Sequence, residues 1–221
     1  MPTVRITPFL ALTLLVGCAA VSGEGHILTE DAKASSSAQS CCASIDALLA
    51  NASPLPPEQF AFTPQSRHYS FDSGLAPFEV YQLGDIPRDG ELSILSHMRL
   101  RGWVQGGDGT AHYADSQVFF FDKDRRPLGT RLVVKQQVST SDGRALQKRF
   151  VVPQVARYVV IATDVRQNGL MESSRIEGQA DRPLVAGRTV FFLPGGVLPV
   201  RYRLSTYGPV SIQLSGPVSP R

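Results

Sequence analysis

The sequence has few of the residues from which enzymes and metal proteins usually build their sites. It holds three cysteines and four histidines in 221 residues, and the histidines lack the spacing of metal ligands. It contains no Gly-x-Ser-x-Gly turn, no His-Glu-x-x-His helix and no phosphate-binding glycine loop. The formal net charge of +3 is small and dispersed, which argues against a nucleic-acid footprint. We therefore predict a protein that is not an enzyme, uses no metal or cofactor and binds no nucleic acid.

Long apolar runs are also missing, apart from one near the N-terminus. It spans residues 8–16 and follows a segment whose only charged side chain is Arg5, which is the order of a secretory signal. The run is roughly half the ~20 residues that a helix needs to cross a bilayer. We therefore predict that residues 1–17 are a signal peptide that is removed, and not a permanent transmembrane anchor.

A short motif ends this segment. Leu15-Val16-Gly17-Cys18-Ala19 resembles the bacterial lipobox, in which cleavage leaves a cysteine that carries a thioether-linked diacylglyceride. The two or three acyl chains of such a cysteine hold a protein stably on a membrane. The resemblance implies a lipoprotein anchored through Cys18, and Ala19 after it implies sorting to the outer membrane, on the periplasmic side. An ordinary cleavage site with a free Cys18 is the alternative.

The mature chain begins with a segment that has little to bury. Residues 18–40 are rich in small polar residues, so we expect a flexible tether between the lipid anchor and a folded domain. Residues 41–62 form the next segment, in which Ile45, Leu48 and Leu49 fall on one helical face. The prolines that follow cannot continue a helix, which predicts a short helix and then a proline-rich connector.

Residues 63–216 show a different pattern, with short β-branched and aromatic runs separated by glycine, aspartate and proline. This pattern is typical of all-β folds. Continuous apolar runs at 118–121 and 158–161 predict central strands that are buried on both faces. We predict one antiparallel β-sandwich, jelly-roll-like, with a short N-terminal helix and a C-terminal tail at 217–221. Only the interval 167–188 lacks a clear strand signal, and a loop of that length is usually functional or hides a short element.

The two cysteines that remain after Cys18 are adjacent in sequence. An even number of cysteines suits an exported protein. Consecutive α-carbons are ~3.8 Å apart, however, which is below the usual span of a disulfide, so a Cys41–Cys42 bond would be strained and comparatively reducible. A vicinal disulfide, free or intermolecularly paired thiols, and a redox or metal role are the three interpretations.

Several soft motifs occur in an order and spacing that resembles the maltose operon periplasmic protein (MalM) family. They span most of the mature chain and comprise Cys41-Cys42, Phe71-Asp72-Ser73-Gly74, Phe78-Glu79-Val80-Tyr81-Gln82-Leu83, Val118-Phe119-Phe120-Phe121-Asp122 and Tyr207-Gly208-Pro209-Val210. The family is exported, is associated with maltose and maltodextrin uptake and has no assigned enzymatic activity. The resemblance therefore implies a periplasmic accessory in carbohydrate transport.

A protein that binds sugar needs an aromatic ring against the apolar face of the pyranose and planar polar groups around it. The best candidate segment is glycine-rich, holds the only tryptophan and is expected to form a loop. Its candidate sugar-binding residues are Trp103, Gln105, Asp108, His112 and Tyr113. A packing role for a lone tryptophan is the alternative.

Two hypotheses about function follow. The first is a non-enzymatic lipoprotein that assists maltose or maltodextrin transport and binds a glycan. The second is a structural or docking module of the cell envelope without a sugar ligand, whose partner is a porin or a transporter component. Paired carboxylates for glycoside hydrolysis stay open, because their separation is spatial. The segment 122–124 resembles half a calcium loop, but the arginines that follow favour a strand-ending turn in which Asp122 accepts from nearby backbone amides.

Overall fold

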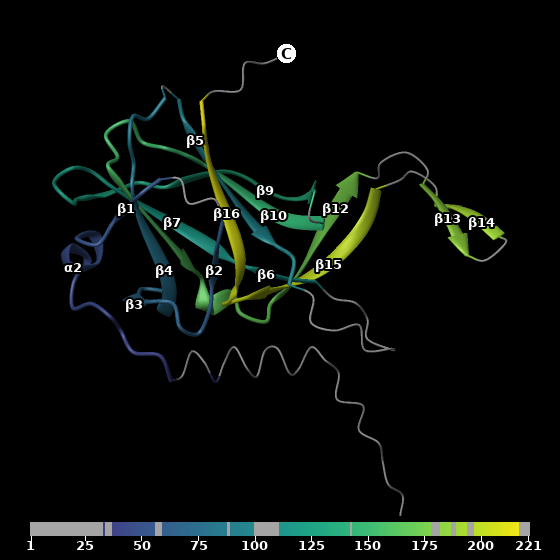
Figure 1. Cartoon of the computed structure of the whole chain (residues 1–221), viewed down its shortest axis with the longest axis horizontal. Helices are drawn as coiled ribbons and strands as arrows, with labels where there is room; N and C mark the ends of the chain where they lie inside the picture. Colours follow the sequence, from purple (N-terminus) through teal and green to yellow (C-terminus); the bar gives the residue numbers. More distant parts are fainter. Residues whose placement is uncertain are drawn as a thin grey trace, which may run out of the picture.

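The structure is a computed structural model of the chain. It describes residues 33, 37–55, 59–87, 89–99, 111–141, 143–177, 182–186, 189–193 and 197–216, with backbone only between 174 and 200. Figure 1 shows two main sheets, a short helix at one end of the molecule and a ribbon of strands that extends from the other end. The predicted all-β sandwich with a short N-terminal helix is confirmed, and the jelly-roll connectivity stays a prediction.

One main sheet has six strands in the order β1-β4-β11-β7-β8, with β3 also paired to β4. Their bounds are β1 (Ser53–Pro54), β3 (His68–Phe71), β4 (Gly74–Gln82), β7 (Ser116–Phe121), β8 (Pro127–Leu128) and β11 (Tyr158–Thr163). The continuous apolar runs predicted to be central strands are β7 and β11, which lie side by side. β11 is buried on both faces, whereas β7 is buried on its inner face and partly buried on its outer face. The second sheet covers the inner face, and the cluster around the N-terminal helix covers the outer face.

The second main sheet has five antiparallel strands in the order β2-β16-β5-β10-β9. Their bounds are β2 (Phe60–Phe62), β5 (Glu91–His97), β9 (Arg131–Thr140), β10 (Gly143–Val151) and β16 (Gly208–Ser215). The largest core cluster fills the space between the two sheets, and its members include Tyr81, Leu92, Ile94, Phe120, Phe150, Val159, Ile161 and Ile212. Each fully buried large side chain contributes about 1.5–3 kcal/mol.

The helix α2 (Ile45–Leu49) covers the outer face of the six-stranded sheet. The Ser44 hydroxyl caps its N-terminus by accepting from the Ala47 amide at 3.3 Å. Leu48 and Leu49 are buried against a second apolar cluster that includes Phe78, Phe121 and Val160. The short helix is therefore held by packing, since one turn and a half of helix is not stable alone.

A smaller sheet joins the end of the sandwich and differs from the predicted antiparallel pattern. It consists of β6 (Ala111–Ala114), β12 (Met171–Glu177) and β15 (Val197–Ser205) in the order β12-β15-β6, and β15 runs parallel to β6. A parallel pair is possible here because the two strands are far apart in sequence and need no hairpin between them.

The interval 167–188 hides two strands. It begins at the end of a 3-10 turn (Val165–Gln167) and holds β12 and β13 (Arg182–Ala186). The last of these forms a hairpin with β14 (Thr189–Leu193) that pairs with no other described strand. In Figure 1 this hairpin lies at the far end of the ribbon formed by β12 and β15.

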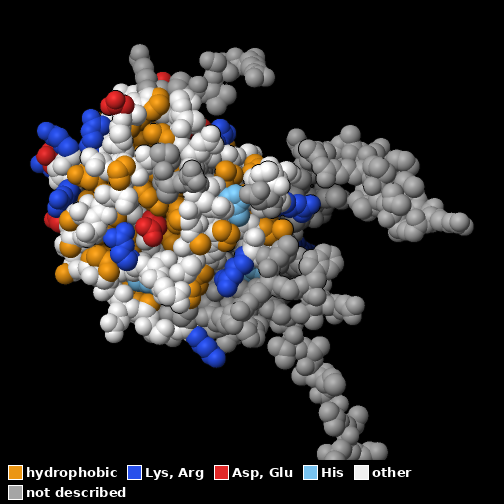
Figure 2. All heavy atoms as spheres, viewed as in Figure 1, with side chains coloured by type: hydrophobic (Ala, Val, Ile, Leu, Met, Phe, Trp, Pro, Cys, Tyr) orange, Lys and Arg blue, Asp and Glu red, His pale blue; other side chains and the backbone are white. Residues whose placement is uncertain are grey.

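The surface of the sandwich is mixed in character. On the face shown in Figure 2, basic and acidic side chains are interspersed with small apolar patches. Among the described residues no helix is long and apolar enough to cross a bilayer.

Candidate functional site

The candidate sugar-binding residues do not all lie where the sequence predicted. Trp103, Gln105 and Asp108 lie outside the described residues. His112 and Tyr113 lie in β6 and are only 2% and 0% exposed. The expectation that these two side chains belong to an exposed loop is therefore wrong, because the parallel strand β15 and the five-stranded sheet enclose β6.

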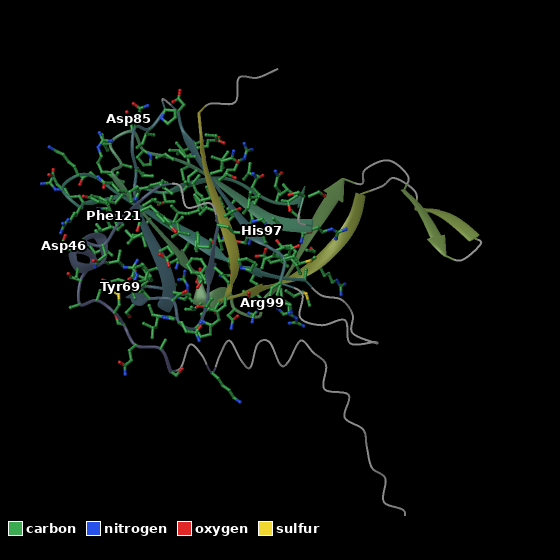
Figure 3. All side chains as sticks on the ribbon, viewed as in Figure 1. Asp46, Tyr69, Asp85, His97, Arg99 and Phe121 are labelled. Atoms are coloured by element: carbon green, nitrogen blue, oxygen red, sulfur yellow. A yellow bond between two sulfur atoms is a disulfide. The ribbon has the colours of Figure 1, made fainter. Side chains whose placement is uncertain are left out.

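The described residues on either side of 100–110 lie close together. The backbone amide of Arg99 donates to the His112 carbonyl at 2.9 Å, and the Met98 amide donates to the Arg144 carbonyl at 3.0 Å. Figure 3 places Arg99 beside the base of β6 and β15. The described residues that flank the segment 100–110 therefore lie at the junction of β5, β6 and β10.

An aromatic pair occupies this junction. The rings of Tyr113 and Tyr202 meet edge to face with centroids 5.4 Å apart, and they pack with Leu146 and Leu204. The Tyr113 hydroxyl is buried and has no hydrogen-bond partner among the described residues. Burial raises the pKa of Tyr113, and the nearby Arg144 guanidinium partly offsets the rise, so the hydroxyl stays protonated and can donate as well as accept.

Gln137 is a second polar group buried in the same place. It lies in β9, directly opposite Leu146 of β10, and is 8% exposed. Neither its amide nitrogen nor its amide oxygen has a partner among the described residues. A buried amide without hydrogen bonds costs about 1–3 kcal/mol, so a group that bonds this amide stabilises the protein by a comparable amount.

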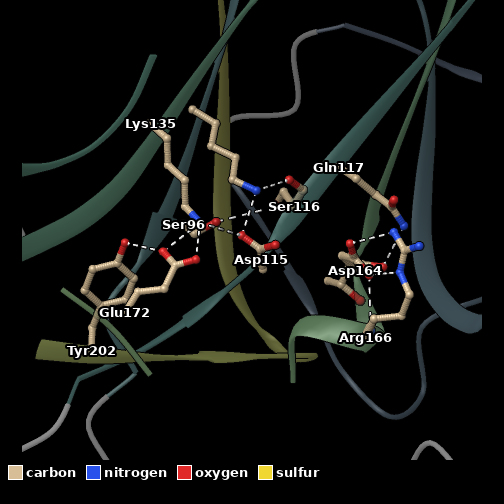
Figure 4. A network of polar contacts seen from close by, with 11 residues as sticks. Ser96, Asp115, Ser116, Gln117, Lys135, Asp164, Arg166, Glu172 and Tyr202 are labelled. Carbon is tan, nitrogen blue, oxygen red and sulfur yellow. Dashed lines mark hydrogen bonds and ion pairs between the residues drawn. The ribbon is translucent and has the colours of Figure 1, made fainter. Parts of the chain in front are cut away.

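The contacts of Lys135 show that the face of β9 that carries Gln137 is directed toward β12. Lys135 shares the face of Gln137, two residues away, and its ammonium donates to Glu172 of β12 at 2.7 Å. The Tyr202 hydroxyl donates to the same carboxylate at 2.7 Å, and Figure 4 shows the two donors reaching Glu172 from different sides. Gln137, Tyr113, Tyr202, Lys135 and Glu172 therefore line one region between β9 and the three-stranded sheet, which we call the sheet junction.

These contacts determine the protonation states of Glu172 and Tyr202. Burial alone would raise the pKa of Glu172, but the hydrogen bonds from Lys135 and Tyr202 outweigh it and lower the pKa. Burial and the bond to Glu172 raise the pKa of Tyr202. Glu172 is thus ionised and Tyr202 neutral at physiological pH, and the charges in contact are balanced.

A buried ion pair lies next to the sheet junction and contacts Lys135. The Asp115 carboxylate, between β6 and β7, contacts the Lys148 ammonium at 2.6 Å and the Lys135 ammonium at 3.7 Å. Lys148 also donates to the Ser116 carbonyl at 2.8 Å, and the Asp115 backbone is bonded to Ser205 and Asp164. Asp115 therefore ties both main sheets to the three-stranded sheet.

We expect Glu172→Gln to change how stability depends on pH. Because folding lowers the pKa of Glu172, its ionised form stabilises the fold above the usual value of 4.5 and the benefit is lost as the pH falls through the lowered pKa. The substitution should therefore cost about 1 kcal/mol at pH 7, and the difference should shrink below pH 4.5. Urea unfolding at several pH values measures both quantities, and a difference that stays constant with pH contradicts this account.

One serine and histidine pair was not predicted from the sequence. His97 of β5 and Ser211 of β16 lie in hydrogen-bond contact at 2.8 Å, and Figure 3 labels His97. A nucleophile with a base needs free backbone amides to bind the oxyanion. Here both residues lie within regular antiparallel strands, with no described turn or helix N-terminus beside them to present such amides, so we interpret the pair as a cross-strand contact.

The other candidates have structural roles. Cys41 and Cys42 are joined by a disulfide, and the Cys41 amide donates to the His68 carbonyl of β3 at 2.8 Å. The turn after β7 is as predicted, because Asp122 accepts from the amides of Asp124 and Arg126 at 2.8 and 2.9 Å. In the described part of the chain, no cluster of three or more histidine, cysteine or acidic residues is arranged to hold a metal ion. Cys18 lies outside the described residues.

Comparisons of the chain with models of protein families, with curated proteins and with solved structures gave no match.

Proposed function

We propose that this protein is a non-enzymatic, lipid-anchored accessory of carbohydrate transport on the periplasmic side of the outer membrane, and that it binds a glycan at the sheet junction. The observation that carries the binding proposal is a set of buried polar atoms that have no partner among the described residues, namely those of the Gln137 amide and the Tyr113 hydroxyl. Evolution rarely retains such groups in a core unless a ligand or an ordered water bonds them.

The chemistry of the sheet junction favours an uncharged ligand rich in hydroxyl groups. Lys135 and Glu172 are already paired with each other. The two groups without a partner among the described residues, the Gln137 amide and the Tyr113 hydroxyl, are neutral and include both donors and acceptors. The Tyr113 and Tyr202 rings supply apolar surface next to them, which suits the alternating polar and apolar faces of a sugar. Arg99 and His112, which flank the segment with Trp103, are joined by a backbone hydrogen bond close to these rings.

The remaining parts of the proposal rest on the sequence. The lipobox-like motif at Cys18 supports the lipid anchor, and the resemblance to the MalM family supports maltose or maltodextrin as the sugar. Burial of the N-terminal end of the domain against the six-stranded sheet, through α2 and the Cys41–Cys42 disulfide, gives the tether a fixed point of attachment.

Gln137→Met tests the proposal because it should change stability and binding in opposite directions. The substitution replaces the amide by an apolar group of similar length, so the free protein should gain about 1–3 kcal/mol, which corresponds to roughly 2–12 °C in Tm. Maltodextrin binding should weaken roughly 10- to 100-fold, because the ligand loses the hydrogen bonds of the amide. Thermal unfolding with and without maltose, maltodextrins and unrelated glycans measures both effects.

Gln136→Met is the matched control. Gln136 is the adjacent residue on β9, faces the other way and donates to Gln147 at 3.0 Å, so binding should be unchanged. A Gln137→Met protein that is less stable than the unaltered chain would assign the amide a structural role. If no glycan raises Tm, the sheet junction is not a sugar site and the docking hypothesis takes its place.

A further inference from the structure

The edges of the described sheets are protected against pairing with other chains, with one exception. Unpaired strand edges template association, and proteins blunt them with short strands, prolines, charges or bulges. The edge strand β9 carries Arg131 and Lys135 and has a register shift opposite Arg149 and Phe150. The edge strand β12 has the sequence MESSRIE and carries three charged residues of alternating sign.

The other edges are blunted as well. β1 and β8 are two residues long and each contains a proline, and β2 has three residues. The Ser40 bridge to His68 covers part of β3, and the Arg99 bridge to His112 covers part of β6. In the outer hairpin, β13 begins with Arg182 and Pro183, and proline cannot donate to a ladder.

The exception is β14, whose sequence TVFFL contains no charge and no proline. Its only partner among the described strands is β13, with Leu184 opposite Phe191. Arg188 is the one charged residue between Pro183 and Val200, so this hairpin belongs to the most apolar part of the mature sequence. A two-stranded hairpin alone is marginally stable in water, and further strands are needed to stabilise it.

We propose that β14 pairs antiparallel with β14 of a second copy of the chain, about a two-fold axis at Phe191. In this register Thr189 faces Leu193 of the second copy, Val190 faces its Phe192, and no charged residue faces another. The result is a four-stranded sheet in the order β13-β14-β14-β13. Because Arg182 and Pro183 blunt the outer edges of that sheet, pairing stops at two copies instead of continuing into a fibre.

This inference is independent of the proposed glycan site, which lies at the other end of the ribbon between the sheets. Because the proposed two-fold axis passes at residue 191, this residue lies opposite residue 191 of the second copy. A charge introduced there therefore lies opposite an identical charge. Like charges directly opposite each other destabilise a strand pair, and opposite charges stabilise it. The test therefore uses Phe191→Lys and Phe191→Glu, separately and mixed.

The mass of the mature protein is measured by sedimentation velocity in density-matched detergent. We expect the unaltered chain to be a dimer, and we expect both Phe191→Lys and Phe191→Glu to be monomers whose dimerisation is weakened on the order of 100-fold. An equimolar mixture of the two should form dimers again. The matched control is Leu184→Lys, which places the same charge across the hairpin from Phe191, one strand further from the axis, and should remain a dimer.

Three results would overturn the proposal. The first is an unaltered chain that is monomeric at the highest concentration measured. The second is a Phe191→Lys protein that remains dimeric, which would place the dimer contact on another surface. The third is a mixture of the two charge variants that stays monomeric, which would mean that the substitutions only disrupt the hairpin.

Discussion

Asp115→Ala is expected to lower the free energy of unfolding by about 3–5 kcal/mol, because it leaves Lys148 buried without its carboxylate. The side chains of Asp115 and Lys148 are 7% and 12% exposed, and the remaining bond from Lys148 to the Ser116 carbonyl does not neutralise the charge. For a domain of this size the loss corresponds to a fall in Tm on the order of 10 °C. Urea unfolding at pH 7 measures it.

Two further variants distinguish the buried charge from a general effect of substitution. Asp46→Ala removes an ion pair with Arg125 whose side chains are 65% and 41% exposed, and should cost less than about 1 kcal/mol. The double replacement Asp115→Leu with Lys148→Met removes both charges together and should restore most of the stability that Asp115→Ala loses. An Asp115→Ala protein as stable as Asp46→Ala would show that Lys148 reaches solvent.

Phe120→Ala should have an effect of similar size, also about 3–5 kcal/mol, through a cavity in the main core. Phe120 is 0% exposed and lies in β7 between the two main sheets. The neighbouring Phe119 provides the control. It points to the outer face, is only partly buried and stacks on Phe71 with centroids 5.2 Å apart, so Phe119→Ala should cost about half as much. Equal losses in the two variants would contradict the assignment of the two faces.

The central strands could be predicted from the sequence because their surroundings leave a local signal. A run such as Val118–Phe121 has no polar residue, which is typical of a strand that is covered on both faces. The same holds for Tyr158–Ile161, which lies beside it as β11. The helix α2 was predicted for the same reason, since Ile45, Leu48 and Leu49 mark one face.

The sheet junction could not be predicted, because its residues are polar and become buried only through distant parts of the chain. Nothing near Gln137 or Glu172 in sequence distinguishes them from surface residues of an exposed strand. His112 and Tyr113 follow a glycine-rich segment that indicates a loop, and β6 is covered by β15, which comes about ninety residues later. Buried amide groups without partners are visible only in the folded structure.

The interval 167–188 illustrates another limit of the sequence. In β12 (MESSRIE) charged and small residues leave no hydrophobic period, and β13 (RPLVA) is short and begins with an arginine and a proline. They are strands because β15 and β14 pair with them, and pairing depends on register more than on local propensity.

The position of β16 determines when the five-stranded sheet can form during folding. This last strand lies inside the five-stranded sheet, between β2 and β5, with Gly208 opposite Phe62 and Leu214 opposite Leu92. Residues 208–215 therefore have to pair with residues 60–62 and 91–96 before this sheet is complete, and such distant pairing makes folding slow. Until β16 is in place, β2 has no partner among the described strands of this sheet and β5 is paired on one side only, so the core between the two main sheets stays open.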